Sequence, residues 1–252
     1  MTDLTRRSLI YGSAAVAALG LAACTTDSSP QVAASVPPPP SPPQPGASGP
    51  EPMGPLSAER YAAIYGAVTG DRFPIPAVKL SLIKPAFLRQ VVDYKTTEAP
   101  GTIIVDPAHH HLYHVLEDGR ATRYGVGVGR EGFAWAGDAV IKSKQEWPDW
   151  YPPKEMLERQ PELKAKMSQL QSGLGMPGGP GNPLGVRAMY LWQGNKDTLF
   201  RIHGTVEPWT IGKSVSSGCI RMINQDVIDL YNNTPAGTKV VVLGSPGAPH
   251  VG

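Results

Sequence analysis

A proline-rich stretch, residues 28–55, sets where the folded part of this chain can begin. It reads SSPQVAASVPPPPSPPQPGASGPEPMGP. Proline has no backbone N–H, and small polar residues offer little apolar surface, so burial cannot offset the entropy lost on ordering this stretch. We therefore expect residues 25–55 to be a disordered spacer with polyproline II character, and a folded part that starts near Leu56.

The first 24 residues have the pattern of an export signal. A positively charged start is followed by an apolar run, Leu9–Ala22, that is too short for a membrane-spanning helix. Arg6 and Arg7 before the run fit a twin-arginine signal, and an ordinary Sec signal is the alternative. We expect a protein of the periplasm or cell envelope.

The end of this signal, Leu21–Cys24, reads LAAC and resembles a bacterial lipobox. The resemblance implies that Cys24 is lipidated and that acyl chains anchor the protein to a membrane. Thr25, rather than aspartate, follows the cysteine, and by resemblance to other bacterial lipoproteins this favours anchoring at the outer membrane. The alternative is simple cleavage near Ala23, with Cys24 playing no part.

Charge and composition exclude some functional classes. The net charge of +2 is small and scattered, so no basic stripe for nucleic acid is present. Residues 125–132, GVGVGREG, follow a strand pattern without the helix that a dinucleotide fingerprint needs. The histidines within His109–His114 alternate faces if that segment is a strand, which disfavours a metal site. We expect no metal and no cofactor.

From about residue 100 the pattern changes to short runs of β-branched and aromatic residues. Turn residues, such as Asp118-Gly119 and Gln193-Gly194-Asn195, separate several of them. The sequence predicts a mostly β fold with short helices, of the α+β class. The expected strand segments are residues 101–107, 111–129, 187–193, 198–204 and 238–244.

Helical patterns surround and interrupt these strands. We expect an N-terminal extension, residues 56–99, with short helices over Ala58–Val68, capped by Ser57, and over Pro85–Tyr94. A helix over residues 152–170, broken at Pro161, forms an insert. A last helix over residues 224–234 is capped by Asn224, and residues 245–252 form a flexible tail.

Apart from the lipobox cysteine, the chain has one cysteine, Cys219, which makes it a lone thiol. A lone thiol is either a buried apolar filler or a nucleophile. Gly218 leaves space beside the sulfur, Ser216 and Ser217 are polar, and Arg221 shares a face with Cys219 if the backbone is extended. These neighbours favour the nucleophile.

A nucleophilic thiol needs a base, because the thiolate is the attacking form. His203 lies 16 positions before Cys219, at the end of an expected strand, and a turn at VEPW brings the chain back beside it. A hydrogen-bonded structural histidine is the alternative.

The segment 201–231, RIHGTVEPWTIGKSVSSGCIRMINQDVIDLY, resembles the catalytic segment of the L,D-transpeptidase (YkuD-type) family of bacterial peptidoglycan enzymes. The resemblance extends over about residues 100–244. It implies a β-sandwich or barrel catalytic domain with a helical and loop insert. Many members have histidine where Ser217 stands, so this chain resembles the Ser-Ser-Gly-Cys subgroup and His203 must serve alone.

The resemblance implies an acyl transfer on peptidoglycan stem peptides. Cys219 attacks the bond between diaminopimelate and D-alanine of a donor tetrapeptide, D-alanine leaves, and an acceptor amine resolves the thioester into a 3→3 cross-link. His203 is the base, and backbone N–H groups of Gly218 and Cys219 bind the oxyanion, in a loop with Ser216 and Ser217. Water as acceptor would give an L,D-carboxypeptidase, and a lipoprotein amine would give an anchoring enzyme.

Three residues are expected to bind substrate: Arg221, Gly204 and Thr205. A guanidinium suits a carboxylate of the stem peptide. The alternative for Arg221 is an ion pair with Asp226 or Asp229, and the alternative for Thr205 is a turn.

Two further classes compete with this hypothesis. Papain-like and NlpC-type peptidases also pair cysteine with histidine, but they place the cysteine first. A non-catalytic peptidoglycan-binding lipoprotein would not need a base. The segments Trp147–Pro153 and Gly173–Gly185 flank the insert and form either a lid over the substrate or a rigid loop.

Overall fold

A computed structural model describes residues 53–129, 136–216 and 218–244. Contacts divide the chain into two units, Met1–Ala47 and Ser48–Gly252, and all described residues belong to the second. The expected leader, the lipobox and nearly all of the spacer therefore lie outside the described residues, as does the expected tail. Among the residues that are described, no helix has the length and apolarity to cross a bilayer.

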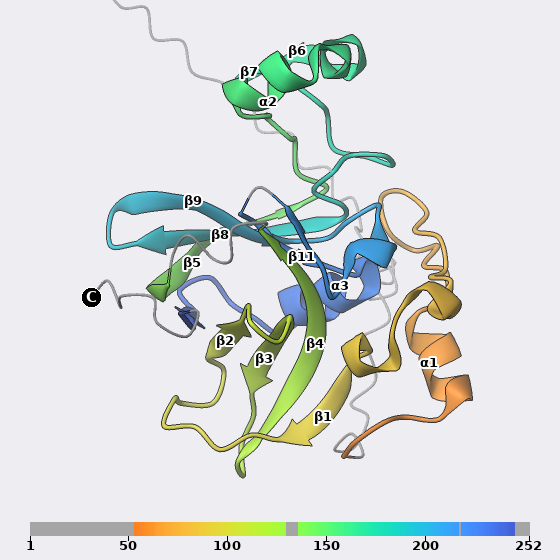
Figure 1. Cartoon of the computed structure of the whole chain (residues 1–252), viewed down its shortest axis with the longest axis vertical. Helices are drawn as coiled ribbons and strands as arrows, with labels where there is room; N and C mark the ends of the chain where they lie inside the picture. Colours follow the sequence, from red (N-terminus) through yellow and green to blue (C-terminus); the bar gives the residue numbers. More distant parts are fainter. Residues whose placement is uncertain (1–52, 130–135, 217, 245–252) are drawn as a thin grey trace, which may run out of the picture. The chain divides into compact units, whose positions relative to one another are not determined.

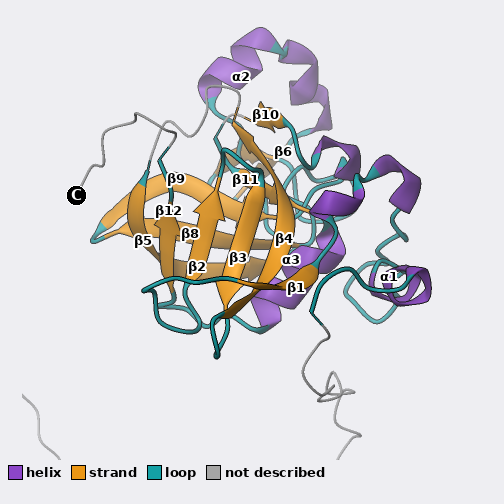
Figure 2. Cartoon of the chain, turned by 60° about the horizontal axis from the view of Figure 1, so that its bottom comes forward, coloured by secondary structure: helices purple, strands orange, loops and turns teal. Residues whose placement is uncertain are grey.

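The second unit is built on a closed β-barrel (Figures 1 and 2). Its strands follow the order β4-β11-β9-β8-β5-β12-β2-β3, and β3 pairs again with β4, which closes the ring; β1 and β10 attach to β4 from outside. The strands are β1 (Gln90–Asp93), β2 (Ile103–Asp106), β3 (His111–Val115), β4 (Arg120–Gly129), β5 (Gly137–Glu146), β8 (Arg187–Gln193), β9 (Lys196–His203), β10 (Ser214–Ser216), β11 (Ile220–Met222) and β12 (Lys239–Val242).

The expected mostly β fold is confirmed, because alternate residues of the expected strands, together with those of β5, which was not expected, fill the barrel. Fully buried side chains from seven of its strands include Ile103, Leu112, Tyr124, Ile141, Met189, Leu191, Ile202 and Ile220. Asp118 and Gly119 both have positive φ, 59° and 68°, in the hairpin that joins β3 to β4. This left-handed pair is the turn that the Asp-Gly sequence predicts.

The helix expected over Pro85–Tyr94 is wrong. Only Pro85–Phe87 forms a 3₁₀ turn, and Gln90–Asp93 is β1, which pairs antiparallel with β4. The β-branched pair Val91-Val92 fits a sheet edge better than a helix, and the open edge of β4 supplies the partner. The extension is thus joined to the barrel by a strand.

The other helices are shorter than expected. Helix α1 covers Ala58–Ile64, and the hydroxyl of Ser57 accepts a hydrogen bond from the Arg60 N–H as expected of a cap. Helix α3 covers Asn224–Asn232, but its N-cap is Ile223 and not Asn224. The Asn224 amide oxygen instead accepts a hydrogen bond from the Val186 N–H, which links α3 to the start of β8.

The insert between β5 and β8 is only partly helical. Helix α2 (Lys154–Arg159) and a 3₁₀ helix (Pro161–Lys166) meet at Pro161, which confirms the expected break. Ser168–Leu170 is not helical, however, because it forms the strand β6 and pairs with β7 (Gly173–Gly175). Figure 1 shows α2 next to this hairpin.

A second small core joins the extension to the barrel. It contains Tyr61, Tyr65, Ile83 and Leu88 of the extension together with Ile211 and Ile223, which lie on either side of Cys219 in the sequence. The extension is therefore packed against the segment that carries the expected nucleophile.

Candidate active site

The two expected catalytic residues are brought together by β9 and β11, which are adjacent and parallel. Ile202 pairs with Ile220, and His203 pairs with Arg221. Since Ile202 and Ile220 are fully buried in the barrel core, the residues on either side of them, His203 and Arg221 among them, belong to the opposite face of the sheet. Cys219 directly precedes β11, so the histidine and the cysteine come from neighbouring strands.

His203 is held in one orientation by its own chain. Its Nδ1 lies 2.6 Å from the carbonyl oxygen of Gly204. Because a carbonyl only accepts, Nδ1 carries the proton, and Nε2 of the neutral ring is left as the acceptor. Burial, with the positive charges of Arg221 and Arg201, lowers the pKa of His203 to about 4, although hydrogen bonds with the backbone of Gly204 and Leu184 raise it. The imidazole is therefore neutral at pH 7 and can accept a proton.

Cys219 is half-buried, and burial raises the pKa of its thiol. A hydrogen bond from the Arg201 backbone and the positive charges of Arg201 and Arg221 act in the opposite direction. The resting pair is therefore a neutral thiol and a neutral imidazole, so the proton must move during attack. Gly218 has a φ of 135°, and a Cβ there would lie 2.9 Å from Phe200 Cε1, which explains the glycine before the cysteine.

Arg201 is a residue that the sequence analysis missed. Its guanidinium binds the carboxylate of Asp197 through two hydrogen bonds of 2.7 and 2.8 Å, and it lies 4.5 Å from the ring centroid of Tyr190. Arg201 is two positions before His203 on β9, so strand alternation gives both residues the same face. That alternation was the signal that could have identified it.

Arg221 forms an ion pair, but with neither of the two expected aspartates. Its NH1 lies 3.1 Å from Glu207 Oε2. Asp226 and Asp229 pair with Arg89 of the extension instead. The expectation of a pair with those two residues is therefore wrong, because α3 turns them towards the extension.

Gly204 and Thr205 both make contacts within the protein. The Gly204 N–H donates to the Arg187 carbonyl at 3.0 Å, and a Cβ on Gly204 would meet the Asn224 amide oxygen. The Thr205 hydroxyl accepts a hydrogen bond from the Glu207 N–H at 3.0 Å, so Thr205 is a turn residue in this structure. Gly204 contacts the candidate site through its carbonyl oxygen, which accepts the Nδ1–H of His203.

The loop before the nucleophile begins with β10, which pairs parallel with the end of β4. The Ser214 hydroxyl lies 3.1 Å from Nε2 of His110, a residue with a positive φ of 56°. Ser217 and the side chain of Ser216 lie outside the described residues. Besides its pairing with β4, the loop is therefore held by a side-chain contact from the β2–β3 hairpin.

The histidine run His109–His111 has separate partners. His109 Nδ1 lies 2.7 Å from Asp106, and His111 Nε2 lies 3.1 Å from the Ala86 carbonyl oxygen. Within the described residues, no group of three or more histidine, cysteine or acidic side chains could hold a metal. The glycines of the GVGVG run permit close packing, since a Cβ on Gly125 would clash with Phe87.

A cavity of about 450 Å³ adjoins the catalytic segment. Its lining is mostly apolar, with the indoles of Trp147 and Trp209 and the side chain of Lys79. The two flanking segments of the insert are bound to each other, because Trp150 bridges to Met176 and the amide of Asn182 donates to the carbonyl of Pro148. Further lining comes from Pro74–Val78, Leu82, Gly179–Gly181, Gly185, Val186, Thr205, Val206, Pro208 and Ile223–Gln225.

Comparison with known proteins gives the family. The model of the L,D-transpeptidase catalytic domain (YkuD) matches residues 100–242, more than half of the chain. The chain belongs to this family, which confirms the resemblance of its catalytic segment. The family is one of acyl-transferring enzymes.

Curated relatives carry the same family name. The chain is 33% identical over 196 residues, 76% of its length, to "Probable L,D-transpeptidase ErfK/SrfK" of Escherichia coli (strain K12), and covers 55% of that protein. It is 30% identical over 149 residues, 57% of its length, to "Probable L,D-transpeptidase YbiS" of the same strain, and covers 45% of it. The chain thus spans about half the length of these relatives.

A solved structure described as a probable carnitine operon oxidoreductase from Brucella melitensis is 53% identical to the chain. It covers 66% of this chain and 99% of its own, with a TM-score of 0.43.

Proposed function

We propose that this protein is a peptidoglycan L,D-transpeptidase in which Cys219 is the nucleophile and His203 the base. The observation that carries the proposal is the fixed orientation of His203. Its Nδ1–H is bound by the Gly204 carbonyl, which leaves Nε2 as the acceptor on a strand adjacent to the cysteine. Family membership supports the reaction class.

In the proposed reaction, Cys219 Sγ attacks the carbonyl carbon of the residue before the terminal D-alanine of a tetrapeptide stem. The thiol proton passes to His203 Nε2, and the tetrahedral oxyanion is bound by backbone N–H groups near Gly218. The amide bond then breaks, and His203 returns the proton to the leaving D-alanine amine. An acceptor amine attacks the thioester and regenerates the thiol, which gives a 3→3 cross-link.

The arginines have separate roles in this proposal. Arg201 is fully engaged by Asp197 and Tyr190, so it supplies a fixed positive charge near the thiol. Arg221 has a single ion pair to the half-exposed Glu207, and a guanidinium has five N–H donors. It therefore suits a carboxylate of the stem peptide better than Arg201 does.

The test is a reaction of the purified protein with disaccharide-tetrapeptide that contains diaminopimelate, read by mass spectrometry. We expect dimers with 3→3 links and release of D-alanine, and neither with Cys219→Ala. Tripeptide without dimer at high acceptor concentration would identify an L,D-carboxypeptidase instead. A product that requires a lysine-ended lipoprotein peptide would identify an anchoring enzyme, and unchanged peptide would favour a non-catalytic binding protein.

We further propose that the protein acts in the periplasm and is anchored to a membrane through lipid on Cys24. Thr25 after the cysteine favours the outer membrane, and residues 25–55 hold the folded part away from the membrane surface. The support is the lipobox-like sequence Leu21–Cys24 and the proline content of the spacer. Cells grown with an alkyne-tagged fatty acid should label the wild-type protein but not Cys24→Ala. Equal labelling of both would remove the anchor from the proposal.

A further inference from the structure

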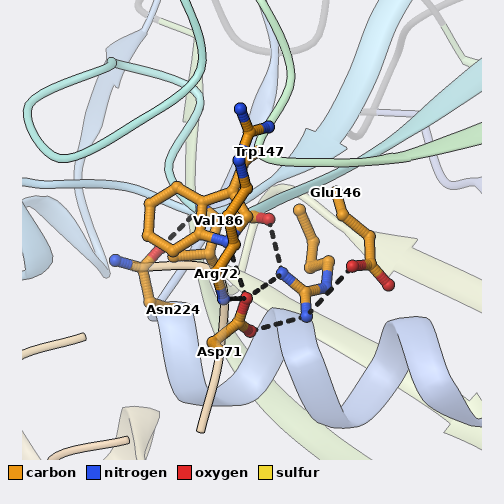
Figure 3. Close-up of polar contacts among 7 residues, drawn as sticks. Asp71, Arg72, Glu146, Trp147, Val186 and Asn224 are labelled. Atoms are coloured by element: carbon orange, nitrogen blue, oxygen red, sulfur yellow. Dashed lines mark hydrogen bonds and ion pairs between the residues drawn. The ribbon is translucent and has the colours of Figure 1, made fainter. Parts of the chain in front are cut away.

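The carboxylate of Asp71, in the N-terminal extension, binds two side chains that lie beside the candidate active site. Asp71 lies in a loop before residue 100, outside the residues that the family model matches. Its Oδ2 lies 2.6 Å from NH2 of Arg187, and its Oδ1 accepts a hydrogen bond of 2.6 Å from the indole N–H of Trp147 (Figure 3). The side chains of Asp71 and Arg187 are only 9% and 8% exposed.

The partner Arg187 is directly connected to the expected base. It begins β8, which pairs with β9, and its carbonyl accepts the N–H of Gly204 at 3.0 Å. The Gly204 carbonyl in turn accepts Nδ1–H of His203. Asp71 therefore binds the side chain of Arg187, and the backbone of Arg187 binds Gly204, whose carbonyl orients His203.

The second partner, Trp147, forms a wall of the cavity beside the catalytic segment. Trp147 has a positive φ of 47°, which is strained for a bulky residue and persists only where the surroundings fix it. The surroundings are the Asp71 carboxylate on the indole, the Val186 carbonyl on the backbone N–H, and the ring of Phe73 at 5.0 Å. Two of these three contacts come from the extension.

The other acid near Arg187 does not replace Asp71. Glu146 lies 3.8 Å from NH2, and its side chain is 59% exposed. A buried cation needs a close partner, because its hydration is lost. Asp71 is thus the close counter-charge of Arg187 within the described residues, and Glu146 is a peripheral one.

We propose that Asp71 is a positioning residue of the active site: it holds Arg187 and Trp147, and through them it fixes the backbone that orients His203 and one wall of the adjacent cavity. The extension then completes a catalytic domain whose family-matched residues begin only at residue 100. The role of His203 as a base rests on the proposed function.

The experiment compares Asp71→Asn with Glu146→Gln in the full-length protein. Both variants remove one negative charge near the same guanidinium, so Glu146→Gln is the matched control. Two quantities are measured: the rate of carbapenem acylation per titrated thiol, and the pKa of the His203 imidazole by NMR, with the signal assigned from His203→Ala. The NMR measurement requires no activity.

We expect Asp71→Asn to lower the acylation rate per thiol by about 10–100-fold, the usual effect of a small misplacement of catalytic groups. The pKa of His203 should move from about 4 towards its ordinary value, because a loosened ring is better hydrated. Glu146→Gln should change both quantities little. Equal effects of both variants, or a lower melting temperature with an unchanged rate and an unchanged His203 pKa, would overturn the proposal.

If Asp71→Asn does not fold, the double variant Asp71→Ala/Arg187→Met removes the buried cation together with its partner. We expect it to fold and to show the same slow acylation and the same shifted His203 pKa, whereas wild-type behaviour of this variant would overturn the proposal. If the wild-type protein is not acylated, the proposed function fails, and the His203 pKa alone decides whether Asp71 positions the imidazole.

Discussion

Arg221 and Glu207 form an ion pair of 3.1 Å beside the candidate active site, on the face of the sheet to which His203 belongs. The Glu207 side chain is 46% exposed and that of Arg221 is 20% exposed. The acid therefore occupies the guanidinium that we propose for a stem-peptide carboxylate. Substrate must displace Glu207 or share Arg221 with it.

This competition predicts the effect of Glu207→Gln. Exposed pairs contribute about 0.2–1 kcal/mol, so the substitution should lower KM for the tetrapeptide by up to about fivefold, with little change in kcat. Arg221→Ala should raise KM in the same assay. A KM for Glu207→Gln that is unchanged or higher would mean that Arg221 does not bind the substrate carboxylate.

Cys219→Ser should abolish acyl-enzyme formation with a carbapenem while the protein stays folded. A serine hydroxyl has a pKa far above that of a thiol, and a neutral imidazole alone does not activate it sufficiently. Intact mass spectrometry detects the adduct, and the melting temperature of the variant serves as the control. An adduct on the serine protein would contradict the assigned nucleophile.

His203→Ala should slow the acylation of Cys219 by about 10²–10⁴-fold, the range for loss of a positioned general base. Pre-steady-state mass spectrometry at neutral pH measures the rate. His110→Ala is a comparison, since His110 contacts Ser214 of the same loop without being the proposed base. A rate for His203→Ala near that of the wild type would make His203 structural.

The acidic limb of the acylation rate should lie near pH 4 rather than near 6.5. The base must be neutral to accept a proton, and burial lowers the pKa of His203 to about 4. The rate should therefore be nearly constant from pH 7 down to about pH 5 and fall below that. A limb centred between pH 6 and 7 would show that the imidazole is more hydrated than in this structure.

The stability of the protein should respond to Asp226, a fully buried residue in the first turn of α3. Burial raises the pKa of Asp226 to about 7, so the folded state binds a proton that the unfolded state releases near pH 4. Its stabilising contribution is complete below about pH 4 and is lost as the pH rises through 7. Asp226→Asn should raise the melting temperature at pH 8 by about 2–4 °C, equivalent to about 1 kcal/mol.

Asp229→Asn is the matched control for that experiment. Asp229 is the close partner of the buried Arg89 guanidinium and accepts a hydrogen bond of 2.6 Å from Tyr124. Its loss should destabilise the protein by about 1–3 kcal/mol at pH 8. Thermal unfolding of both variants between pH 4 and 8 checks the sign, and parallel losses for the two would contradict the raised pKa of Asp226.

The sequence pointed to the residues of the candidate active site through local signals, and their catalytic roles stay predictions. Cys219 and His203 each lie in a short motif, and strand alternation placed Arg221 on the face of the cysteine. The barrel strands that follow an alternating or apolar pattern were also predicted. The strand β5 was missed because its outward positions carry lysines and acids, and only Ala139 and Ile141 are buried.

Contacts between distant segments had no such signal. β1 pairs with residues 120–123 of β4, which are unpaired on that side because the short strand β11 pairs only with residues 126 and 127. Asp71 and Arg187 are 116 positions apart, and neither lies in a motif. The partner of Arg221 depends on a turn after His203 that brings Glu207 back towards the strand, and this geometry could not be read from residue types.

The position of β12 has a consequence for how the chain acquires its fold. Val240 pairs with Ile103 on one side and with Ala139 on the other, so the last strand of the described residues lies between two strands that are made much earlier. Until residue 242 has left the ribosome, β2 and β5 both expose unpaired backbone edges, which are sites of aggregation. Folding of the barrel is therefore a late, long-range event in biosynthesis, and a slow folding rate is expected from the high contact order.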